Sequence, residues 1–163
     1  MIVAAALIIG LLVWRFWPHP LSSVISVEKS AVTSIACSAS IGGVENGEPY
    51  IYSFTLSGLL PQDDGFEEIM EILDSSSYRQ DFRNLLPWSI HSVGSDNTNN
   101  VLVADVVLVW GSGENESCFI SMHSESMIAV SLRTESGLKV YHPTSREMLD
   151  TLAEYLQTHG SKG

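Results

Sequence analysis

Hydrophobic positions follow three different patterns along the chain. Residues 1–17 are apolar almost without a break, whereas residues 62–74 and 145–158 place apolar side chains at the spacing of one helix face. The stretches between these segments alternate, or run apolar over short distances, as strands do. Together the patterns predict a transmembrane anchor (1–17), a connector (18–30) and one acidic α+β soluble domain (31–160).

The N-terminal segment has the features of a membrane anchor. Its first stretch, MIVAAALIIGLLVW, contains no charge and no proline. A helix over residues 1–17 covers about 25 Å, near the lower limit for a bilayer core of about 30 Å. Trp14 and Trp17 suit the membrane interface, and Pro18 ends the helix. We therefore expect the lipid bilayer to be a partner of the chain through residues 1–17.

A cleaved signal peptide is the competing interpretation of the same segment. It requires a basic stretch before the apolar run and small residues at a cleavage site soon after it. The sequence has neither feature, because no Lys or Arg precedes the apolar run and bulky residues follow it. The pattern therefore favours a retained signal-anchor helix, which makes the chain a single-pass membrane protein.

Two opposing signals bear on the side of the membrane that the domain occupies. Arg15 and Lys29 are the cations nearest the helix, and both follow it, so the positive-inside rule places the domain in the cytoplasm. A domain poor in lysine, rich in Ser and Asn and containing two cysteines is more typical of the extracytoplasmic side. We expect a cell-membrane protein with its domain outside the cytoplasm.

The domain is predicted to consist of an antiparallel sheet of about five to six strands, packed by two or three helices. Strand patterns bounded by turn residues occur at 31–41, 50–56, 101–110, 118–122, 127–132 and 138–141. The first two are expected to form a hairpin with a loop longer than the tightest kind, and the last four an antiparallel meander. Residues 101–109 are almost all apolar, which indicates a central strand covered on both faces or nearly so.

The helix predicted at 62–74 has one apolar and one acidic face. Its apolar face consists of Phe66, Ile69, Met70 and Leu73, and the opposite side carries Glu67, Glu68 and Glu71. Asp63 or Asp64 is expected to cap its first turn, where a carboxylate complements the helix dipole.

The C-terminal helix is predicted from its caps and its stripe. Thr144 and Glu147 fit a capping box ahead of a helix over 145–158, and Gly160 follows it. Its apolar stripe consists of Met148, Leu149, Leu152, Tyr155 and Leu156. A further short helix is predicted at 78–86, ended by Pro87.

Charge limits the partners that the domain is expected to bind. The chain carries 8 Lys and Arg against 19 Asp and Glu, a formal net charge of −11. Nucleic-acid affinity depends on cations that neutralise phosphates, so we expect no nucleic-acid partner. The acid excess instead favours a protein of basic character. The glutamates of 62–74 are interpreted first as a solvated helix face and second as a partner site.

Cysteines and histidines are few and widely spaced. Cys37 and Cys118 lack any metal-binding spacing, and His91, His123 and His142 form no paired motif. The sequence leaves open whether the two cysteines form a disulfide or stay reduced and buried, since that depends on the compartment. No metal site is expected.

A thiol nucleophile is the enzymatic alternative. Cys118, activated by His123 or His142 and oriented by Asp105, would supply one, because the thiolate is the attacking species. However, Cys118 begins a strand pattern, where a buried structural cysteine is the ordinary outcome, and no catalytic motif occurs in the chain. We therefore expect no catalytic, cofactor-binding or metal-binding residue.

Two further patterns are compatible with surface roles. The aromatic residues Trp88, Trp110, Tyr50, Tyr52 and Tyr141 suffice for a binding surface, although core packing explains most of them equally well. Asn115 lies in a glycosylation acceptor pattern, which matters only in a eukaryotic secretory setting. The sequence as a whole favours a membrane-tethered, non-enzymatic binding or assembly domain, and its alternative is a membrane-anchored hydrolase or thiol enzyme using Cys118.

Overall fold

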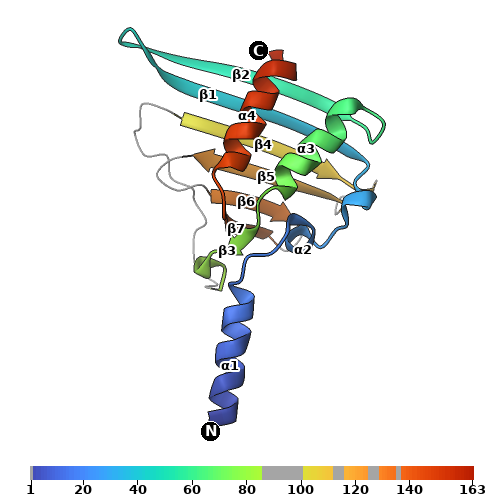
Figure 1. The fold of residues 1–163 in the computed structure, drawn as a ribbon. Helices are drawn as coiled ribbons and strands as arrows, with labels where there is room; N and C mark the ends of the chain where they lie inside the picture. The colour runs from blue at the N-terminus through green and yellow to red at the C-terminus, as the bar shows by residue number, and fades with distance from the viewer. Residues whose placement is uncertain (1, 86–100, 112–115, 125–128, 135–136) are drawn as a thin grey trace.

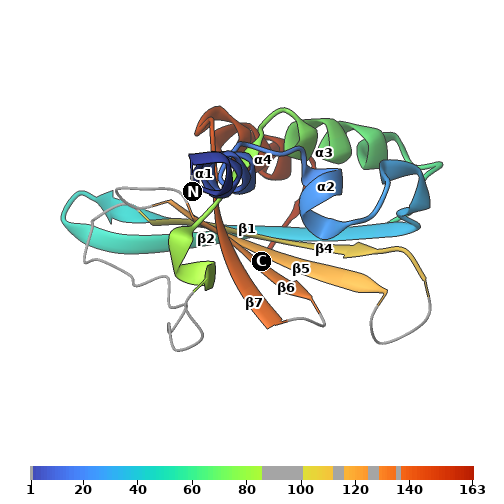
Figure 2. The same ribbon diagram turned by 90° about the horizontal axis from the view of Figure 1, so that it is seen from below.

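The computed structural model describes residues 2–85, 101–111, 116–124, 129–134 and 137–163. The chain forms an α+β domain with one antiparallel sheet, and helices cover one side of that sheet (Figures 1 and 2). The helices are α1 (Ile2–Arg15), α2 (Leu21–Ile25), α3 (Asp64–Asp74) and α4 (Glu147–His159), with the short 3₁₀ helices η1 (Lys29–Ala31) and η2 (Phe82–Leu85).

Within the described residues the sheet has eight strands in the order β3-β7-β6-β5-β4-β1-β2-β8, rather than the predicted five or six. Their bounds are β1 (Ser34–Glu45), β2 (Glu48–Leu59), β3 (Tyr78–Gln80), β4 (Val101–Val109), β5 (Ser117–Ser124), β6 (Ala129–Thr134), β7 (Gly137–Pro143) and β8 (Ser161–Lys162). The meander from β4 to β7 is confirmed, as is the central position of β4 between β1 and β5. The predicted cover on both faces of β4 is not found among the described residues, because the helices lie on one side of the sheet (Figure 2) and Val103 and Val107 on the other side are only half-buried. The two additional strands, β3 and β8, are short pieces at the sheet edges.

The first hairpin is longer and its turn tighter than the sequence pattern indicates. β1 and β2 pair from Ile35 to Glu45, and only Asn46 and Gly47 connect them. Both turn residues have positive φ, 53° and 85°, which is the backbone of a type I′ turn. The prediction of a longer loop is therefore wrong, because an Asn-Gly pair adopts this two-residue turn at little steric cost.

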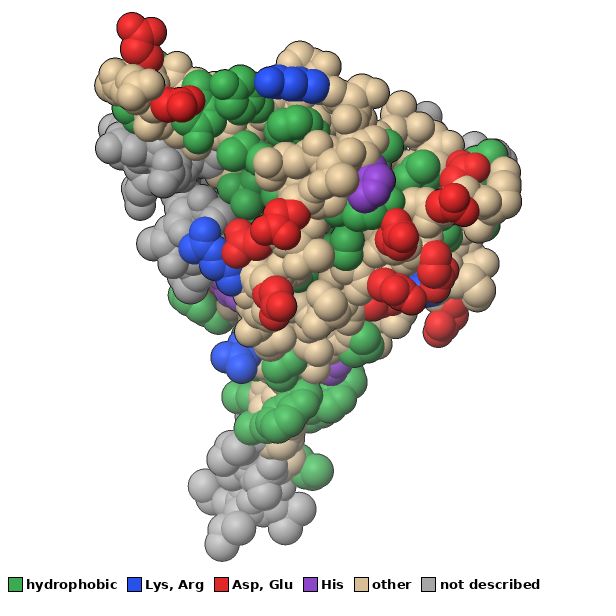
Figure 3. Space-filling model, turned by 45° about the horizontal axis from the view of Figure 1, so that its top comes forward, with side chains coloured by type: hydrophobic (Ala, Val, Ile, Leu, Met, Phe, Trp, Pro, Cys, Tyr) green, Lys and Arg blue, Asp and Glu red, His purple; other side chains and the backbone are tan. Residues whose placement is uncertain are grey.

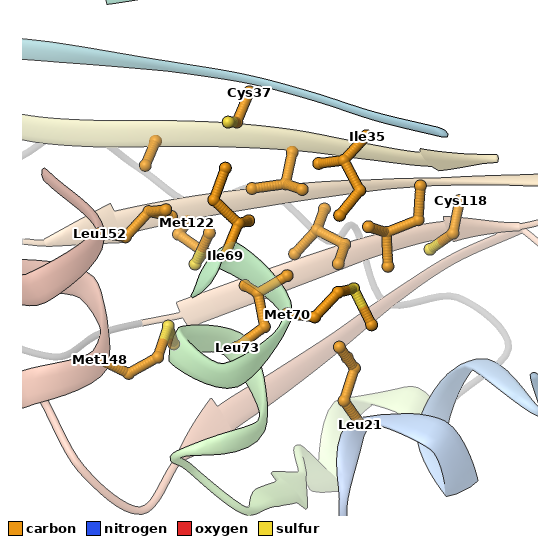
Figure 4. Packing of buried hydrophobic residues seen from close by; sticks show 14 of the residues in the cluster. Leu21, Ile35, Cys37, Ile69, Met70, Leu73, Cys118, Met122, Met148 and Leu152 are labelled. Carbon is orange, nitrogen blue, oxygen red and sulfur yellow. The ribbon is translucent and has the colours of Figure 1, made fainter. Parts of the chain in front are cut away.

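The core lies between the helices and one face of the sheet. On this helix-covered face β1 contributes Ile35, Cys37 and Ala39, β4 contributes Ala104, Val106 and Leu108, and β5 contributes Cys118, Ile120 and Met122, all buried. The apolar faces predicted for α3 and α4 pack against these strand residues, as the close view of the cluster shows (Figure 4). The alternate residues of each strand point to the second face of the sheet.

Residues 18–30, expected as a connector, fold against the domain. They contain α2, whose Leu21 and Ile25 are buried in the same core cluster as the sheet residues. A backbone pair between His19 and Tyr78 also joins this segment to β3, with N···O distances of 3.0 and 2.8 Å. The chain is therefore fixed to the domain directly after α1.

Residues 78–85 do not form the predicted helix, and its last residue Leu86 and the Pro87 expected to end it lie outside the described residues. Tyr78–Gln80 form β3 against β7, and η2 follows as a single 3₁₀ segment. The reason is tertiary, because the backbone of Tyr78 is bonded to His19 on one side and to the sheet on the other. Long-range pairing thus overrides the weak local preference.

The predicted helix caps also differ in detail. Asp63 precedes α3, but its carboxylate accepts a hydrogen bond from the Leu60 N–H at 2.7 Å instead of capping the helix. Thr144 accepts from the Ser77 N–H, and it is Ser145 Oγ that accepts from the Glu147 N–H at the start of α4. The hydroxyl predicted as a cap is therefore used to hold α4 to the segment before β3.

Helix α1 projects away from the domain (Figure 1). It contains 14 residues and ends at Arg15. Within the residues that the structure describes, no helix combines the length and the apolar character needed to cross a bilayer. The transmembrane part of the expected fold thus stays a prediction, whereas its antiparallel α+β part is confirmed.

The packing of α3 against the sheet gives a direct stability prediction. Ile69 is fully buried, and Ile69→Ala should lower the free energy of unfolding by about 2–5 kcal/mol, because the cavity adds to the lost apolar burial. Ile51 is 75% exposed, and Ile51→Ala should change it by less than about 0.5 kcal/mol. Urea unfolding of the full chain in mild detergent measures both, and equal losses would contradict this packing.

Candidate functional site

A groove of about 610 Å³ lies between α3 and α4. Three glutamates line it, Glu68 and Glu71 from α3 and Glu147 from α4, and Ile72 and Tyr155 supply apolar surface. The remaining lining residues are Ser75, Ser145, Thr151 and His159. Figure 3 shows acidic side chains gathered on the helix-bearing side of the molecule. Of the glutamates predicted as one face of α3, Glu68 and Glu71 therefore line a concave surface, whereas Glu67 lies outside the groove and pairs with Lys29.

Tyr155 organises one end of this groove. Its ring stacks on the His159 ring, with centroids 4.3 Å apart and planes 25° from parallel. Burial raises the pKa of Tyr155 to about 12, and its hydrogen bond to the Glu68 carboxylate acts in the same direction. The ring approaches α3 closely because residue 65 is glycine, where a Cβ atom would lie 2.7 Å from the Tyr155 hydroxyl.

The charge of the groove is not balanced by nearby cations. Lys29 pairs with Glu67 at 2.6 Å, and Arg146 pairs with Asp150 at 3.4 Å, both on the outer sides of the helices. Across the described part of the chain, no Lys or Arg lies within ion-pair distance of the three groove glutamates. A cationic ligand would thus find carboxylates that are not already neutralised.

Cys118 lies on the helix-covered face of the sheet. It is fully buried, sits opposite Leu108 in the ladder, and its pKa is raised to about 12 by burial. Asp105 and His123 occupy the other strand parity and point to the second face. The structure thus does not bring Cys118 together with the groups proposed to activate and orient it.

The second face carries a hydrogen-bonded array that includes two of the predicted candidates. Ser121 Oγ donates to Asp105 Oδ1 at 2.6 Å and lies 3.1 Å from His123 Nε2. Because the hydroxyl hydrogen is directed at Asp105, the remaining contact has His123 donating to Ser121. In this order the serine lies between the acid and the imidazole, and its proton points to the acid. A nucleophilic serine needs the opposite arrangement, in which a basic imidazole nitrogen accepts the serine proton.

Sequence reasoning missed Ser121, although a signal for it exists. Ser121 and His123 are two residues apart in one strand, so they share a face, and the antiparallel register places Asp105 opposite Ser121. The array therefore follows from strand parity once the pairing of β4 and β5 is known.

The remaining histidine candidates lie elsewhere. His142 Nε2 contacts Asp81 Oδ2 at 2.8 Å, next to β3, and this carboxylate is buried. His91 lies outside the described residues, as do Trp88 and Asn115. Within the part that is described, no three His, Cys, Asp or Glu side chains converge as metal ligands would.

The two cysteines are free thiols on strands that are not neighbours. Cys37 is in β1 and Cys118 in β5, with β4 between them, which separates their strands by about 9.6 Å. A disulfide needs Cα atoms within about 7 Å. Of the two alternatives left by the sequence, the sheet therefore favours reduced, buried thiols.

Most of the aromatic candidates that are described contact the core or one another. Tyr141 is buried and Trp110 packs against the core. Tyr50 and Tyr52 lie side by side on β2 with ring centroids 5.0 Å apart, and Lys162 sits 4.0 Å above the Tyr52 ring. Core packing thus accounts for the first two, and the tyrosine pair is a surface feature of the hairpin.

No family model, curated protein or solved structure matches this chain.

The environment of the cysteines predicts their reactivity. Burial raises the pKa of Cys37 to about 11 and that of Cys118 to about 12, so at neutral pH neither thiol supplies thiolate. Both should resist a mild thiol reagent in the folded chain and both should react after unfolding. Mass spectrometry of labelled peptides measures this, with a Glu154→Cys variant on the exposed side of α4 as the reactive control. Rapid labelling of native Cys118 would contradict the assignment.

Proposed function

We propose that this protein is a membrane-tethered, non-enzymatic binding domain that engages a basic protein segment through the groove between α3 and α4. The observation that carries the tether is an apolar helix whose described side chains are largely exposed, joined to a domain whose described core cluster contains none of them. The observation that supports the partner is the unneutralised acidic groove.

The exposure of α1 supports its insertion into a bilayer. Leu7, Leu11 and Trp14 are 64%, 65% and 64% exposed, although they belong to the most hydrophobic segment of the chain. The α1 side chains that the structure describes, Leu7 and residues 10–15, are absent from the core cluster, which begins at Leu21. A contiguous apolar surface of this kind is rarely left in water, and lipid covers it without any further protein.

The dimensions of α1 set how it sits in lipid. Its 14 residues extend about 21 Å, which is less than a bilayer core of about 30 Å. A short hydrophobic helix is accommodated by local thinning of the bilayer and by extension of its flanking side chains toward the headgroups. Trp14 and Trp17, both largely exposed, suit the interface at the domain end. The proposal includes a domain outside the cytoplasm, as its composition favours.

The α3–α4 groove is the surface proposed for the partner. It combines three carboxylates with the rings of Tyr155 and His159, so it offers both charge and a flat apolar contact. A segment rich in Lys or Arg complements this combination, because guanidinium and ammonium groups pair with carboxylates and stack on aromatic rings. The alternative of a thiol enzyme receives no support from the position of Cys118.

The tether predicts where the full chain is found in cells. A charge in the centre of an inserted helix costs about 2.5–3.5 kcal/mol, so Leu7→Asp combined with Leu11→Asp should move the protein from the membrane fraction to the soluble fraction. Ile51→Asp, on the exposed hairpin, is the control and should leave the distribution unchanged. Fractionation with a high-salt wash measures this. Wild-type protein that leaves the membrane in salt alone would refute the tether.

The groove predicts a salt-dependent affinity for a basic peptide. Glu71→Gln combined with Glu147→Gln should weaken binding of a fluorescent Lys/Arg-rich peptide between about twofold and about thirtyfold, since exposed ion pairs contribute about 0.2–1 kcal/mol each. Glu45→Gln combined with Glu48→Gln removes the same charge at the distant hairpin tip and is the matched control. Fluorescence anisotropy measures both variants. Equal weakening would mean that only net charge matters, and it would contradict a groove-specific site.

A further inference from the structure

A second pocket, of about 220 Å³, lies where α1 meets the domain. It is lined by Trp14 and Arg15 from the end of α1, by His19 and Ser23 from the following segment, and by Gln80 and Tyr141 from β3 and β7. The backbone pair between His19 and Tyr78 fixes one wall of the pocket to the other. If α1 lies in lipid, this junction lies at the level of the headgroups.

Gln80 shows that the pocket is built for a polar ligand. Its side chain is only 8% exposed, yet among the described residues no group forms a hydrogen bond with its amide. Buried side-chain polar groups are paired in the large majority of cases, and leaving one unpaired costs free energy. Tyr141, also 8% exposed, has a hydroxyl in the same situation. Two unsatisfied polar groups therefore line one cavity.

The other polar groups of the pocket define the charge of that ligand. Arg15 is exposed and has no carboxylate partner within the described part of the chain. Burial raises the pKa of the Tyr141 hydroxyl, and the positive charge of Arg15 lowers it. The Arg15 charge therefore acts on a group that lines the pocket. The pocket thus combines one permanent cation with neutral donors from Gln80, Ser23 and Tyr141.

His19 connects the end of α1 to the wall of this pocket. Its Nε2 lies 3.2 Å from the Trp14 carbonyl oxygen, which can only accept, so Nε2 carries the hydrogen of that bond. The imidazole also packs edge-on against the Trp14 ring, with centroids 5.7 Å apart. Both contacts hold the end of α1 to the pocket wall, which keeps Arg15 near the buried amide.

We propose that this junction pocket binds the phosphodiester group of a phospholipid headgroup, with Arg15 as the counter-charge and Gln80 as a buried hydrogen-bond donor. A phosphodiester carries a single negative charge and only acceptor oxygens, which matches one guanidinium and several neutral donors. Inorganic phosphate is a mixture of the monoanion and the dianion at neutral pH and its monoanion has O–H groups, so it matches this set less well. The inference rests on the proposed tether for one point, which is that the ligand comes from the bilayer. The arrangement of Arg15 and Gln80 in the pocket does not depend on the tether.

The test uses the full chain in maltoside micelles, a detergent without phosphate. It is titrated separately with glycerophosphoglycerol, the deacylated headgroup of phosphatidylglycerol, and with inorganic phosphate, while the Gln80 side-chain amide is followed by NMR. We expect saturable binding of the diester, weaker binding of phosphate, and a shift of the Gln80 amide resonance in the wild-type chain. Tighter binding of inorganic phosphate, or no saturable binding of the diester, would overturn the proposal.

Three variants separate this site from general charge effects. Arg15→Gln and Gln80→Met should each weaken diester binding about tenfold, the usual size for loss of one hydrogen bond to a charged group. Arg79→Gln is the matched control, because Arg79 is an exposed cation that neighbours Gln80 on the opposite face of β3. Equal weakening by Arg79→Gln would show a non-specific effect and would overturn the site.

Stability distinguishes a ligand-binding amide from a structural one. Gln80→Met keeps the size of the side chain and removes an unpaired buried amide, so the melting temperature of the unliganded chain should stay the same or rise. A clear fall would mean that Gln80 has an internal partner, which would overturn its role. A chain that stays in membranes but does not bind the diester refutes this site alone. A chain that binds the diester but leaves the membrane refutes the tether, and the lipid source with it.

Discussion

One-sided burial of the sheet is the constraint on which the rest of the structure depends. Because α2, α3 and α4 cover the same face, every strand in the centre must alternate between a dry side and a second side. That alternation places the thiols and the polar side chains of the central strands on opposite faces of the sheet. The thiols of Cys37 and Cys118 belong to the dry side, where burial suppresses ionisation. Asp105, Ser121 and His123 belong to the other side, where they satisfy one another.

How much of this could be predicted from the sequence depends on the range of the interactions. The helices α3 and α4 were predictable because their apolar residues repeat at a helical period, and that period reports burial directly. β3 and β8 were not, because two or three residues carry no period and only pairing with a distant segment makes them strands. Residues 78–85 illustrate this, since the His19–Tyr78 pair joins segments 59 positions apart in the chain.

The candidate site also has one feature that the sequence could predict and one that it could not. Strand parity alone opposes a Cys118–His123 pair, because residues five apart in one strand point to opposite faces. The acidic groove was beyond sequence reasoning, since it exists only where α3 and α4 lie side by side. The close approach of Tyr155 over Gly65 brings a ring from one helix to the first turn of the other. A lone glycine in an acidic turn gives no sign of that contact.

In the proposed tether, the distribution of charge also determines which surface of the domain faces away from the bilayer. An acidic surface is repelled by anionic headgroups over about one Debye length, roughly 8–10 Å in physiological salt. Arg15 is the last residue of α1, where the helix joins the domain. Its positive charge is therefore at the end of the domain that would face the headgroups. The groove glutamates lie on α3 and α4, in the body of the domain away from α1 (Figure 1). In the proposed tether, repulsion from the membrane would therefore keep the proposed partner surface accessible, while Arg15 beside the buried Gln80 amide would hold this end of the domain at the headgroups.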